Sequence, residues 1–227
     1  MRFCDRREAG QYLAKRLTAY AGRHDVIVLG LPRGGVPLAV EVAQELDAPL
    51  DVLLVRKLGV PARPELAMGA IAAGGVCVLS EDLISELGIS RALVEQVAVH
   101  ERLELERRDR LYRGNRPFPA LCNHTVIVID DGLATGSTME AAVAALRLHH
   151  PARVVVAAPV GAAATCARLR TLADEVVCAQ TPEPFNAVGS WYERFDQTSD
   201  DEVVDLLERA AGHHAAGETA EAFLSGP

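Results

Sequence analysis

Aromatic residues are scarce in this chain, at 4% of its 227 residues. Alanine, valine and leucine must form most of the core, which favours helices layered on parallel strands over an aromatic-rich β-sandwich. The composition, with 49% hydrophobic and 24% charged residues, is typical of a globular chain and excludes collagen-like and coiled-coil arrays. The length predicts a single domain over residues 1–227, because domains usually contain about 150 residues.

Runs of basic residues and long apolar segments are also missing. The chain carries 23 Lys and Arg against 31 Asp and Glu, a formal net charge of −8. We expect no nucleic-acid partner, because such a partner requires a basic surface. No apolar run reaches the ~20 residues that span a bilayer, and the first residues, Met1–Arg6, have no hydrophobic signal segment. We therefore expect a cytoplasmic protein that does not bind a membrane.

Metal-binding patterns are missing as well. His213 and His214 are adjacent, but no third ligand lies near them in the sequence, which argues against a metal site. The cysteines are odd in number and dispersed, without a CxxC pair. We expect reduced thiols rather than disulfides or zinc ligands at all five positions: Cys4, Cys77, Cys122, Cys166 and Cys178.

Short β-branched strands alternate with helices along most of the chain. This order predicts an α/β fold in which helices flank both faces of a parallel sheet. Ligands of such sheets bind at the carboxyl ends of the strands, so the turns after Leu29, Val55 and Ile129 are candidate site segments. Strands are expected at 26–30, 50–56, 125–129, 153–158 and 175–179, and helices between them at 36–46, 138–149 and 162–172.

The remaining segments have simpler expectations. Asp5 should cap a helix that extends to about Ala21. Residues 57–75 contain several glycines and predict a long flexible loop with one short strand, a common form of lid. The helix expected at 90–113 is rich in i,i+4 charge pairs and is a candidate solvated or homodimer face. The core is expected over 22–180, a small hood with a C-terminal helix over 181–212, and a disordered tail over 213–227.

The strongest signal is the segment from Val126 to Thr138, VIVIDDGLATGST. A buried strand leads to two adjacent carboxylates, Asp130 and Asp131, and a turn of small and hydroxyl residues then enters a helix. Backbone N–H groups at such a turn form a cradle for a phosphate monoester. Adjacent carboxylates accept hydrogen bonds from vicinal hydroxyls or hold hydrated Mg²⁺. The segment therefore predicts a ribose 5-phosphate site, unless these side chains only cap the turn and the helix.

This segment resembles the 5-phosphoribosyl 1-pyrophosphate (PRPP) binding motif of type I phosphoribosyltransferases at every position. The resemblance extends from Val26 to about Ala179 and implies a Mg²⁺-dependent enzyme. It implies that Asp130 and Asp131 hold the ribose hydroxyls and, through water, the metal. It further implies that the 5-phosphate is bound by Ala134, Thr135, Gly136, Ser137 and Thr138.

The turn Pro32–Gly35, which follows the first expected strand, resembles the family's pyrophosphate loop. The resemblance implies that Arg33, Gly34 and Gly35 face the pyrophosphate, and it points to the peptide Pro32–Arg33 as the place of a cis bond. Considered alone, the same turn would be an ordinary glycine-rich connection between a strand and a helix.

Lysine occurs only at Lys15 and Lys57, so the pair Arg56-Lys57 at the end of an expected strand is distinctive. It resembles the pair that begins the flexible loop of adenine and orotate phosphoribosyltransferases. The resemblance implies that Arg56 and Lys57 bind the pyrophosphate, that Lys57 acts with Arg33 on the leaving group, and that residues 58–69 close over PRPP.

A cluster of aromatic residues follows the core in a chain that has few others. Phe185, Trp191 and Tyr192 are candidate base-binding residues, because aromatic rings stack on heterocycles. The alternative is that these rings, with Phe195, form a small core under the C-terminal helix. The region around Trp191 resembles a group of predicted bacterial phosphoribosyltransferases whose acceptor is not assigned.

One position departs from part of the family. Hypoxanthine and guanine phosphoribosyltransferases have an aspartate where this chain has Ala134, which resembles adenine phosphoribosyltransferase instead. The predicted function is therefore transfer of the phosphoribosyl group of PRPP to a nucleobase. A purine-like base is favoured over a pyrimidine as the acceptor. Two alternatives remain: a regulator that senses PRPP or nucleotides through the same pocket, and hydrolysis of PRPP or transfer to another amine.

Overall fold

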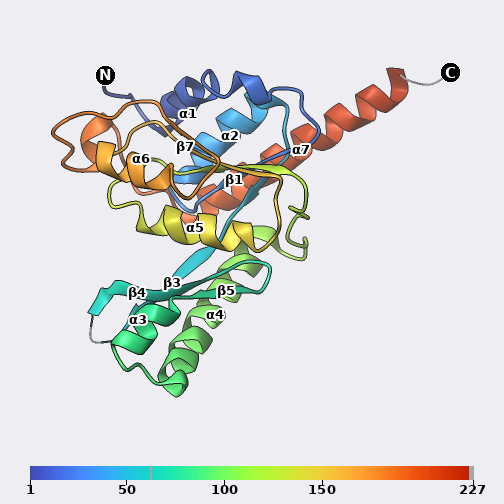
Figure 1. The fold of residues 1–227 in the computed structure, drawn as a ribbon. Helices are drawn as coiled ribbons and strands as arrows, with labels where there is room; N and C mark the ends of the chain where they lie inside the picture. Colours follow the sequence, from blue (N-terminus) through green and yellow to red (C-terminus); the bar gives the residue numbers. More distant parts are fainter. Residues whose placement is uncertain (62, 225–227) are drawn as a thin grey trace.

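The computed structural model describes residues 1–61 and 63–224 (Figure 1). Its main body is a five-stranded parallel sheet, which confirms the predicted α/β fold. The strands lie in the order β2 (Leu50–Val52), β1 (Val26–Gly30), β6 (Thr125–Ile129), β7 (Arg153–Ala158) and β8 (Glu175–Cys178).

Helices cover both faces of this sheet, as the buried strands require. On one face α1 (Arg6–Ala14) and α2 (Gly35–Leu46) pack on Val26 and Val28. On the other face α5 (Ser137–Arg147) and α6 (Ala163–Leu169) pack with Ile27 and Leu29. Because successive strand residues point to opposite faces, an unbroken apolar strand such as β1 supplies both cores.

A second sheet lies beside the main body and corrects the prediction for residues 57–75. The antiparallel strands β3 (Val55–Val60) and β4 (Arg63–Ala72) occupy most of the expected loop, and a third strand, β5 (Val76–Leu79), follows it. Leu58 and Met68 are fully buried against helix α4 (Arg91–Arg113). The glycines of this segment indicated a loop, but they allow close strand contact: a Cβ on Gly69 would lie 2.4 Å from the Val78 carbonyl oxygen.

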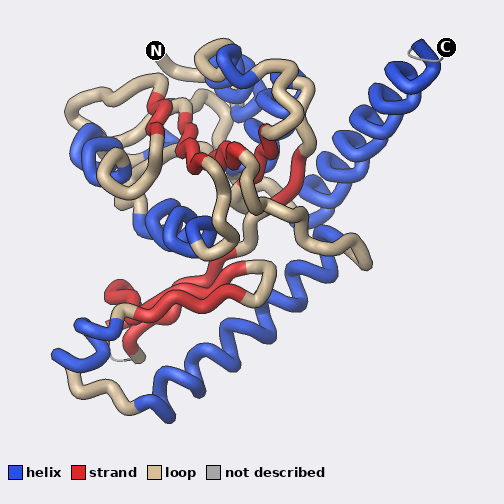
Figure 2. Tube along the Cα trace, turned by 45° about the vertical axis from the view of Figure 1, so that its right-hand side comes forward, coloured by secondary structure: helices blue, strands red, loops and turns tan. Residues whose placement is uncertain are grey.

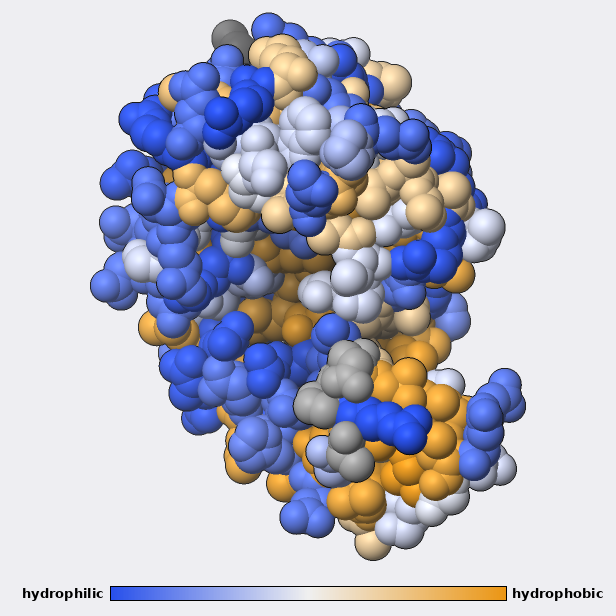
Figure 3. Space-filling model, turned by 90° about the vertical axis from the view of Figure 1, so that its left-hand side faces the viewer, coloured by the Kyte–Doolittle hydropathy of each residue, from blue (hydrophilic) through white to orange (hydrophobic). Residues whose placement is uncertain are grey.

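The expected strand 50–56 is divided between the two sheets. Its first residues form β2 in the parallel sheet, and its last residues begin β3 in the antiparallel sheet. Figure 2 shows the antiparallel sheet with α3 (Glu81–Glu86) and α4 as a unit below the main body. Figure 3 shows a hollow between the two parts, with a hydrophobic floor.

The ends of the chain also differ from expectation. Asp5 caps α1 by accepting the Glu8 N–H at 3.0 Å, as predicted, but the helix ends at Ala14, before a short 3₁₀ turn, η1 (Thr18–Tyr20). The last helix, α7 (Asp200–Leu224), extends past its expected end at residue 212. The predicted tail thus begins inside this helix, and its residues 225–227 lie outside the described residues, as do the side chains of the two adjacent histidines.

Over the part of the chain that the structure describes, no helix has both the length and the hydropathy to cross a membrane.

Helix α4 carries one of the predicted i,i+4 charge pairs: Arg108 pairs with Glu104 at 2.7 Å. The same helix exposes 45% of Val99 and 62% of Leu103, and its role as a homodimer face stays a prediction.

Helix α4 is joined to the parallel sheet by one buried arginine. Arg113 Nε lies 3.0 and 3.1 Å from the two carboxylate oxygens of Asp51. Its other nitrogens pair with Asp109 and donate to the Val52 carbonyl oxygen, and its side chain is 0% exposed. The guanidinium also lies 4.9 Å from the Phe118 ring centre. This one side chain therefore connects the antiparallel unit to β2.

We expect Arg113→Ala to destabilise the protein by about 3–5 kcal/mol, because it leaves the Asp51 carboxylate without its buried partner. Urea unfolding would measure this loss. Arg110→Ala is the matched control: Arg110 is exposed on the same helix, and its loss should change the free energy of unfolding by less than about 0.5 kcal/mol. Equal effects of the two substitutions would contradict the assigned role of Arg113.

Candidate active site

Two loops meet where β1 and β6 end. The strands pair in register to Gly30 and Ile129, and Leu31 N–H then donates to the Ile129 carbonyl oxygen at 2.8 Å. A Cβ on Gly34 would lie 2.0 Å from Asp131 Oδ2, and one on Gly35 would lie 2.4 Å from the Ile129 oxygen. Only glycine fits at these two positions. The adjoining peptide Pro32–Arg33 is cis, which confirms that prediction.

The two acidic residues have different surroundings. Asp130 Oδ1 accepts the Asp131 N–H at 2.9 Å. Asp131 Oδ2 accepts from Arg6 Nε at 2.9 Å and lies 2.8 Å from Arg6 Nη2. Burial, and then the negative charge of Asp131, raise the pKa of Asp130. Burial also raises the pKa of Asp131, while Arg6 acts to lower it.

Sequence reasoning missed Arg6. It stands 125 positions from Asp131, at the start of a helix that carries no phosphate or nucleotide motif. A buried carboxylate pair needs a nearby cation to compensate its charge, and that requirement was the one available signal. It did not indicate which arginine of the chain would supply the charge.

The predicted 5-phosphate loop enters α5 as expected. Gly136 has φ +74° immediately before the helix, a conformation that glycine adopts readily. Ala134, Thr135 and Thr138 are exposed, and the Thr135 and Ser137 hydroxyl oxygens lie 3.3 Å apart. The loop thus offers exposed polar groups at a helix N-terminus, where an anion is stabilised.

Helix α6 makes hydrogen bonds to the backbone of the predicted 5-phosphate loop. Thr165 Oγ1 donates to the Ala134 carbonyl oxygen at 2.6 Å, and Arg168 donates to the Thr135 carbonyl oxygen. A Cβ on Gly136 would lie 2.5 Å from Thr165 Cγ2. The loop backbone is therefore held in position by protein contacts.

The antiparallel sheet brings one predicted residue to this loop. Lys57 Nζ donates to Ser137 Oγ at 3.1 Å. Its neighbour Arg56 turns to α4 instead, with Nε 2.7 Å from Glu101 Oε2. Successive strand residues face opposite ways, which explains why the two cations separate.

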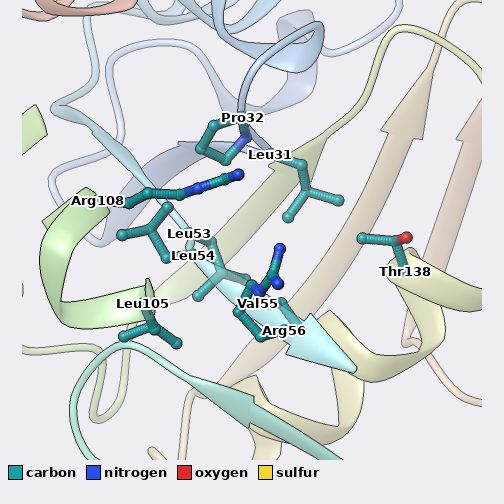
Figure 4. Close-up of a pocket in the computed structure, with 9 residues that line it drawn as sticks. All are labelled: Leu31, Pro32, Leu53, Leu54, Val55, Arg56, Leu105, Arg108 and Thr138. Atoms are coloured by element: carbon teal, nitrogen blue, oxygen red, sulfur yellow. The ribbon is translucent and has the colours of Figure 1, made fainter. Parts of the chain in front are cut away.

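A small pocket lies between the pyrophosphate-loop candidate and α4 (Figure 4). Arg108 extends from α4 toward Pro32, and the Arg56 side chain lines the pocket from β3. Sequence reasoning assigned Arg108 to a solvated helix face and so missed its position here. The pocket is lined by Leu31, Pro32, Leu53, Leu54, Val55, Arg56, Leu105, Arg108 and Thr138.

Arg33 lies toward α7. Its Nη1 is 3.8 Å from Asp200 Oδ1, and the same carboxylate oxygen accepts the Tyr112 hydroxyl at 2.5 Å. Burial, together with this hydrogen bond, raises the pKa of Tyr112 to about 12. The predicted pyrophosphate arginine therefore lies beside a helix that the sequence did not connect with the site.

The predicted base-binding aromatic residues differ in burial. Tyr192 is 1% exposed, packs against Phe3 and donates its hydroxyl to the Asp131 carbonyl oxygen at 2.6 Å. Its ring is part of the core, so the prediction that it stacks on a base is corrected. Phe185 and Trp191 are half-buried, and their base-binding role stays a prediction.

Val188 is a hood residue that sequence reasoning missed. It belongs to the short turn η2 (Val188–Trp191). A Cβ on Gly132 would lie 2.4 Å from Val188 Cγ1, so the hood packs directly on the acidic motif. The signal that could have found it is Gly132 itself, since a glycine beside a functional motif often allows a close approach.

Within the described residues, no three His, Cys, Asp or Glu side chains gather as a metal site. The available donors are the two carboxylates, and Arg6 already occupies one oxygen of Asp131. Mg²⁺ commonly keeps several waters and is held by one or two carboxylates together with substrate phosphates. The donor set fits that mode of binding.

We expect Asp130→Asn to stabilise the fold at pH 8. The fold raises the pKa of the Asp130 carboxyl above its unfolded value of about 3.9. The stability that the protonated carboxyl contributes is fully present below the unfolded pKa, and it is lost as pH rises through the folded pKa. The amide removes the charge and keeps an oxygen for the Asp131 N–H. Thermal unfolding at several pH values should show a Tm gain of a few degrees at pH 8 that shrinks toward pH 4.

Asp174→Asn is the control of opposite sign. Burial acts to raise the pKa of Asp174, but Arg147 and the Val154 N–H lower it overall. This substitution should therefore decrease Tm at pH 8. A decrease for Asp130→Asn as well would show that its ionised form is not disfavoured by the fold.

Comparison with known proteins agrees with this geometry. The family model described as phosphoribosyl transferase domain matches residues 6–67 and 65–201. Two curated Mycobacterium tuberculosis proteins, from strains CDC 1551 and H37Rv, carry the provisional name phosphoribosyl transferase. Each is 50% identical over 208 residues, which are 92% of this chain and 47% of the relative. The chain therefore spans about half the length of these curated relatives.

Solved structures extend the comparison. The crystal structure of TT1426 from Thermus thermophilus is 43% identical, with a TM-score of 0.83, and the match covers 91% of this chain and 98% of that one. The AQ2163 protein of Aquifex aeolicus shares the fold at 14% identity and a TM-score of 0.50, over 81% of this chain and 78% of that one. With the sheet, the acidic motif and the family match together, this chain belongs to the phosphoribosyl transferase domain family.

Proposed function

We propose that this protein is a Mg²⁺-dependent phosphoribosyltransferase that transfers the 5-phosphoribosyl group of PRPP to a nucleobase and releases pyrophosphate. The observation that carries the proposal is the meeting of three segments at one edge of the sheet. The Pro32–Gly35 loop contacts Asp131, and Lys57 reaches the 5-phosphate loop at Ser137. Ala134 favours a purine-like base, because of its resemblance to adenine phosphoribosyltransferase.

Each part of PRPP has a candidate partner. The 5-phosphate would bind the N–H groups and hydroxyls of residues 134–138, at the N-terminus of α5. The ribose hydroxyls would donate to the acidic pair. The pyrophosphate would lie along the Pro32–Gly35 loop, near Lys57 and the pocket that Arg56 and Arg108 line.

The chemistry requires no covalent nucleophile. The bond between the anomeric carbon and the pyrophosphate oxygen breaks, and a nitrogen of the base forms the new bond through an oxocarbenium-like state. Arg33 and Lys57 stabilise the charge of the leaving group, and the two loops hold the ribose in position. Mg²⁺, held through water by the acidic pair, would neutralise further charge on the pyrophosphate.

Exclusion of water is assigned to residues 58–69, as in the sequence prediction. Most of its described residues lie in the antiparallel strands β3 and β4 rather than in a loop, and the closing of this segment over PRPP stays a prediction. A hairpin with Lys57 near its base can move as one element and bring its cation to the substrate.

A second candidate is a regulator that senses PRPP through the same pocket without turnover. It is favoured by the position of Tyr192, which packs in the core and leaves fewer aromatic residues for a base. This alternative would use the same 5-phosphate and ribose contacts.

The deciding experiment measures pyrophosphate release from Mg²⁺–PRPP with a panel of purine and pyrimidine bases. Asp130→Asn/Asp131→Asn is the blank. Release that depends on one base and is absent in the blank supports the transferase and identifies its acceptor. PRPP binding with no release favours the regulator, release without any base shows hydrolysis, and no binding of PRPP contradicts both proposals.

Lys57→Gln should weaken Mg²⁺–PRPP binding by about 10- to 150-fold, because a hydrogen bond to a charged group contributes about 1.5–3 kcal/mol. Isothermal titration calorimetry would measure the Kd. Lys15→Gln is the matched control, since Lys15 is the other lysine and lies exposed after α1. Equal Kd values for the two variants would remove Lys57 from the site.

A further inference from the structure

Two cysteine side chains meet between α6 and β8. Cys166 lies in the middle of α6, Cys178 is the last residue of β8, and both are free thiols. A Cβ on Gly161 would lie 2.9 Å from Cys166 Sγ and 3.0 Å from Cys178 Sγ. The two sulfur atoms therefore pack against the same glycine, and they belong to the same core of the molecule.

The two thiols differ in burial and in acidity. Cys166 is 0% exposed, whereas Cys178 is partly exposed and its thiol donates to the Gln180 carbonyl oxygen at 3.3 Å. The Cys178 thiol can also donate to a Cys166 thiolate, and with the charge of Arg170 it lowers the pKa of Cys166 to about 7, although burial opposes this. The hydrogen bond with Cys166, and then burial, raise the pKa of Cys178. A thiolate beside a protonated thiol is the arrangement from which a disulfide forms.

The segments that carry these sulfurs also hold the predicted 5-phosphate loop. Thr165, on α6, donates its hydroxyl to the Ala134 carbonyl oxygen at 2.6 Å. Gly161 forms a bridge with Leu133 at the start of the loop, where the Ala162 N–H donates to the Leu133 carbonyl oxygen at 2.8 Å. A movement of α6 relative to β8 therefore reaches the loop through direct hydrogen bonds.

We propose that Cys166 and Cys178 form a modification site, at which hydrogen peroxide joins the two sulfurs in a disulfide that displaces the 5-phosphate loop. A disulfide holds its sulfurs about 2.0 Å apart, which is closer than two free thiols can lie, so α6 must shift toward β8. The expected consequence, weaker binding of PRPP, rests on the proposed function. The formation of the disulfide does not.

The oxidation uses one peroxide for each pair of thiols. The Cys166 thiolate attacks a peroxide oxygen, the O–O bond breaks, and the departing hydroxide takes up a proton and leaves as water. The Cys178 sulfur then attacks the resulting sulfenic acid. The S–S bond forms, the S–O bond breaks, and the hydroxyl group leaves as water with the Cys178 proton. The two thiols lose two electrons and the peroxide gains them, and a thiol reductant reverses the change by exchange.

The first test detects the disulfide itself. The whole chain is treated with hydrogen peroxide or with dithiothreitol, and its unreduced peptides are analysed by mass spectrometry. Oxidised wild-type protein should contain a peptide that links Cys166 to Cys178, and dithiothreitol should separate it. Cys178→Ser should form no such link. A wild-type protein that leaves these two thiols unlinked, or links other cysteines instead, overturns the inference.

The matched control is Cys122→Ser, because Cys122 is an exposed thiol outside the pair. This variant should form the link as the wild type does. If Cys178→Ser does not fold, Cys178→Ala or Cys166→Ala takes its place, because each removes one sulfur of the pair.

The second test measures the effect on the loop. Hydrogen exchange at the amides of residues 134–138 should change on oxidation of the wild type and of Cys122→Ser, and it should stay the same in Cys178→Ser. Calorimetry should show that oxidation raises the Kd for Mg²⁺–PRPP by about tenfold or more, because the loss of one hydrogen bond to a charged phosphate has an effect of that size. Dithiothreitol should restore the Kd.

The two readouts separate this inference from the proposed function. A reduced wild-type protein that does not bind Mg²⁺–PRPP overturns the proposed function, and the exchange rates, which need no substrate, then decide the inference. A disulfide that forms without a change in exchange at residues 134–138 overturns the inference. An unchanged Kd in an oxidised protein that binds Mg²⁺–PRPP overturns the inference alone.

Discussion

The arrangement of this protein depends on the close approach of two loops at the ends of β1 and β6. The parallel register carries both strands to the same edge, at Gly30 and Ile129. Gly34 and Gly35 then allow the first loop to contact the Asp131 carboxylate and the Ile129 carbonyl oxygen, at distances that a Cβ would not permit. In the proposed function, this closeness of the two backbones is what would bring the phosphate, diol and pyrophosphate groups of one substrate together.

This close approach has an electrostatic cost. It gathers two carboxylates in a largely buried place, and burial raises the pKa of both. Arg6 compensates part of the charge by pairing with the Asp131 carboxylate, and the Tyr192 hydroxyl donates to the backbone carbonyl oxygen of Asp131. Such groups often reduce stability while they serve binding, since an active site requires charges that a core would avoid. The N-terminal helix and the hood therefore belong to the site as much as the motif does.

The antiparallel unit contributes two cationic side chains to the candidate site. Lys57 of β3 reaches Ser137, and Arg108 of α4 lines the pocket beside Pro32. Both positions depend on how α4 is attached to the parallel sheet, and Arg113 makes that attachment through Asp51. The site thus lies where two sheets meet, with the phosphate loop on one and a candidate leaving-group cation on the other.

The sequence by itself determined the parallel sheet, the Asp5 cap and the segment that carries the acidic pair, because periodicity and turn chemistry act within a few residues. The place of the cis peptide followed from the resemblance of its turn. Tertiary structure alone decided that Arg6 pairs with Asp131, that Tyr192 is buried, and that most of the expected loop 57–75 lies in the strands β3 and β4. The first two depend on contacts between residues 125 and 61 positions apart. The strands depend on burial of Leu58 and Met68 against α4, and no local pattern encodes such packing.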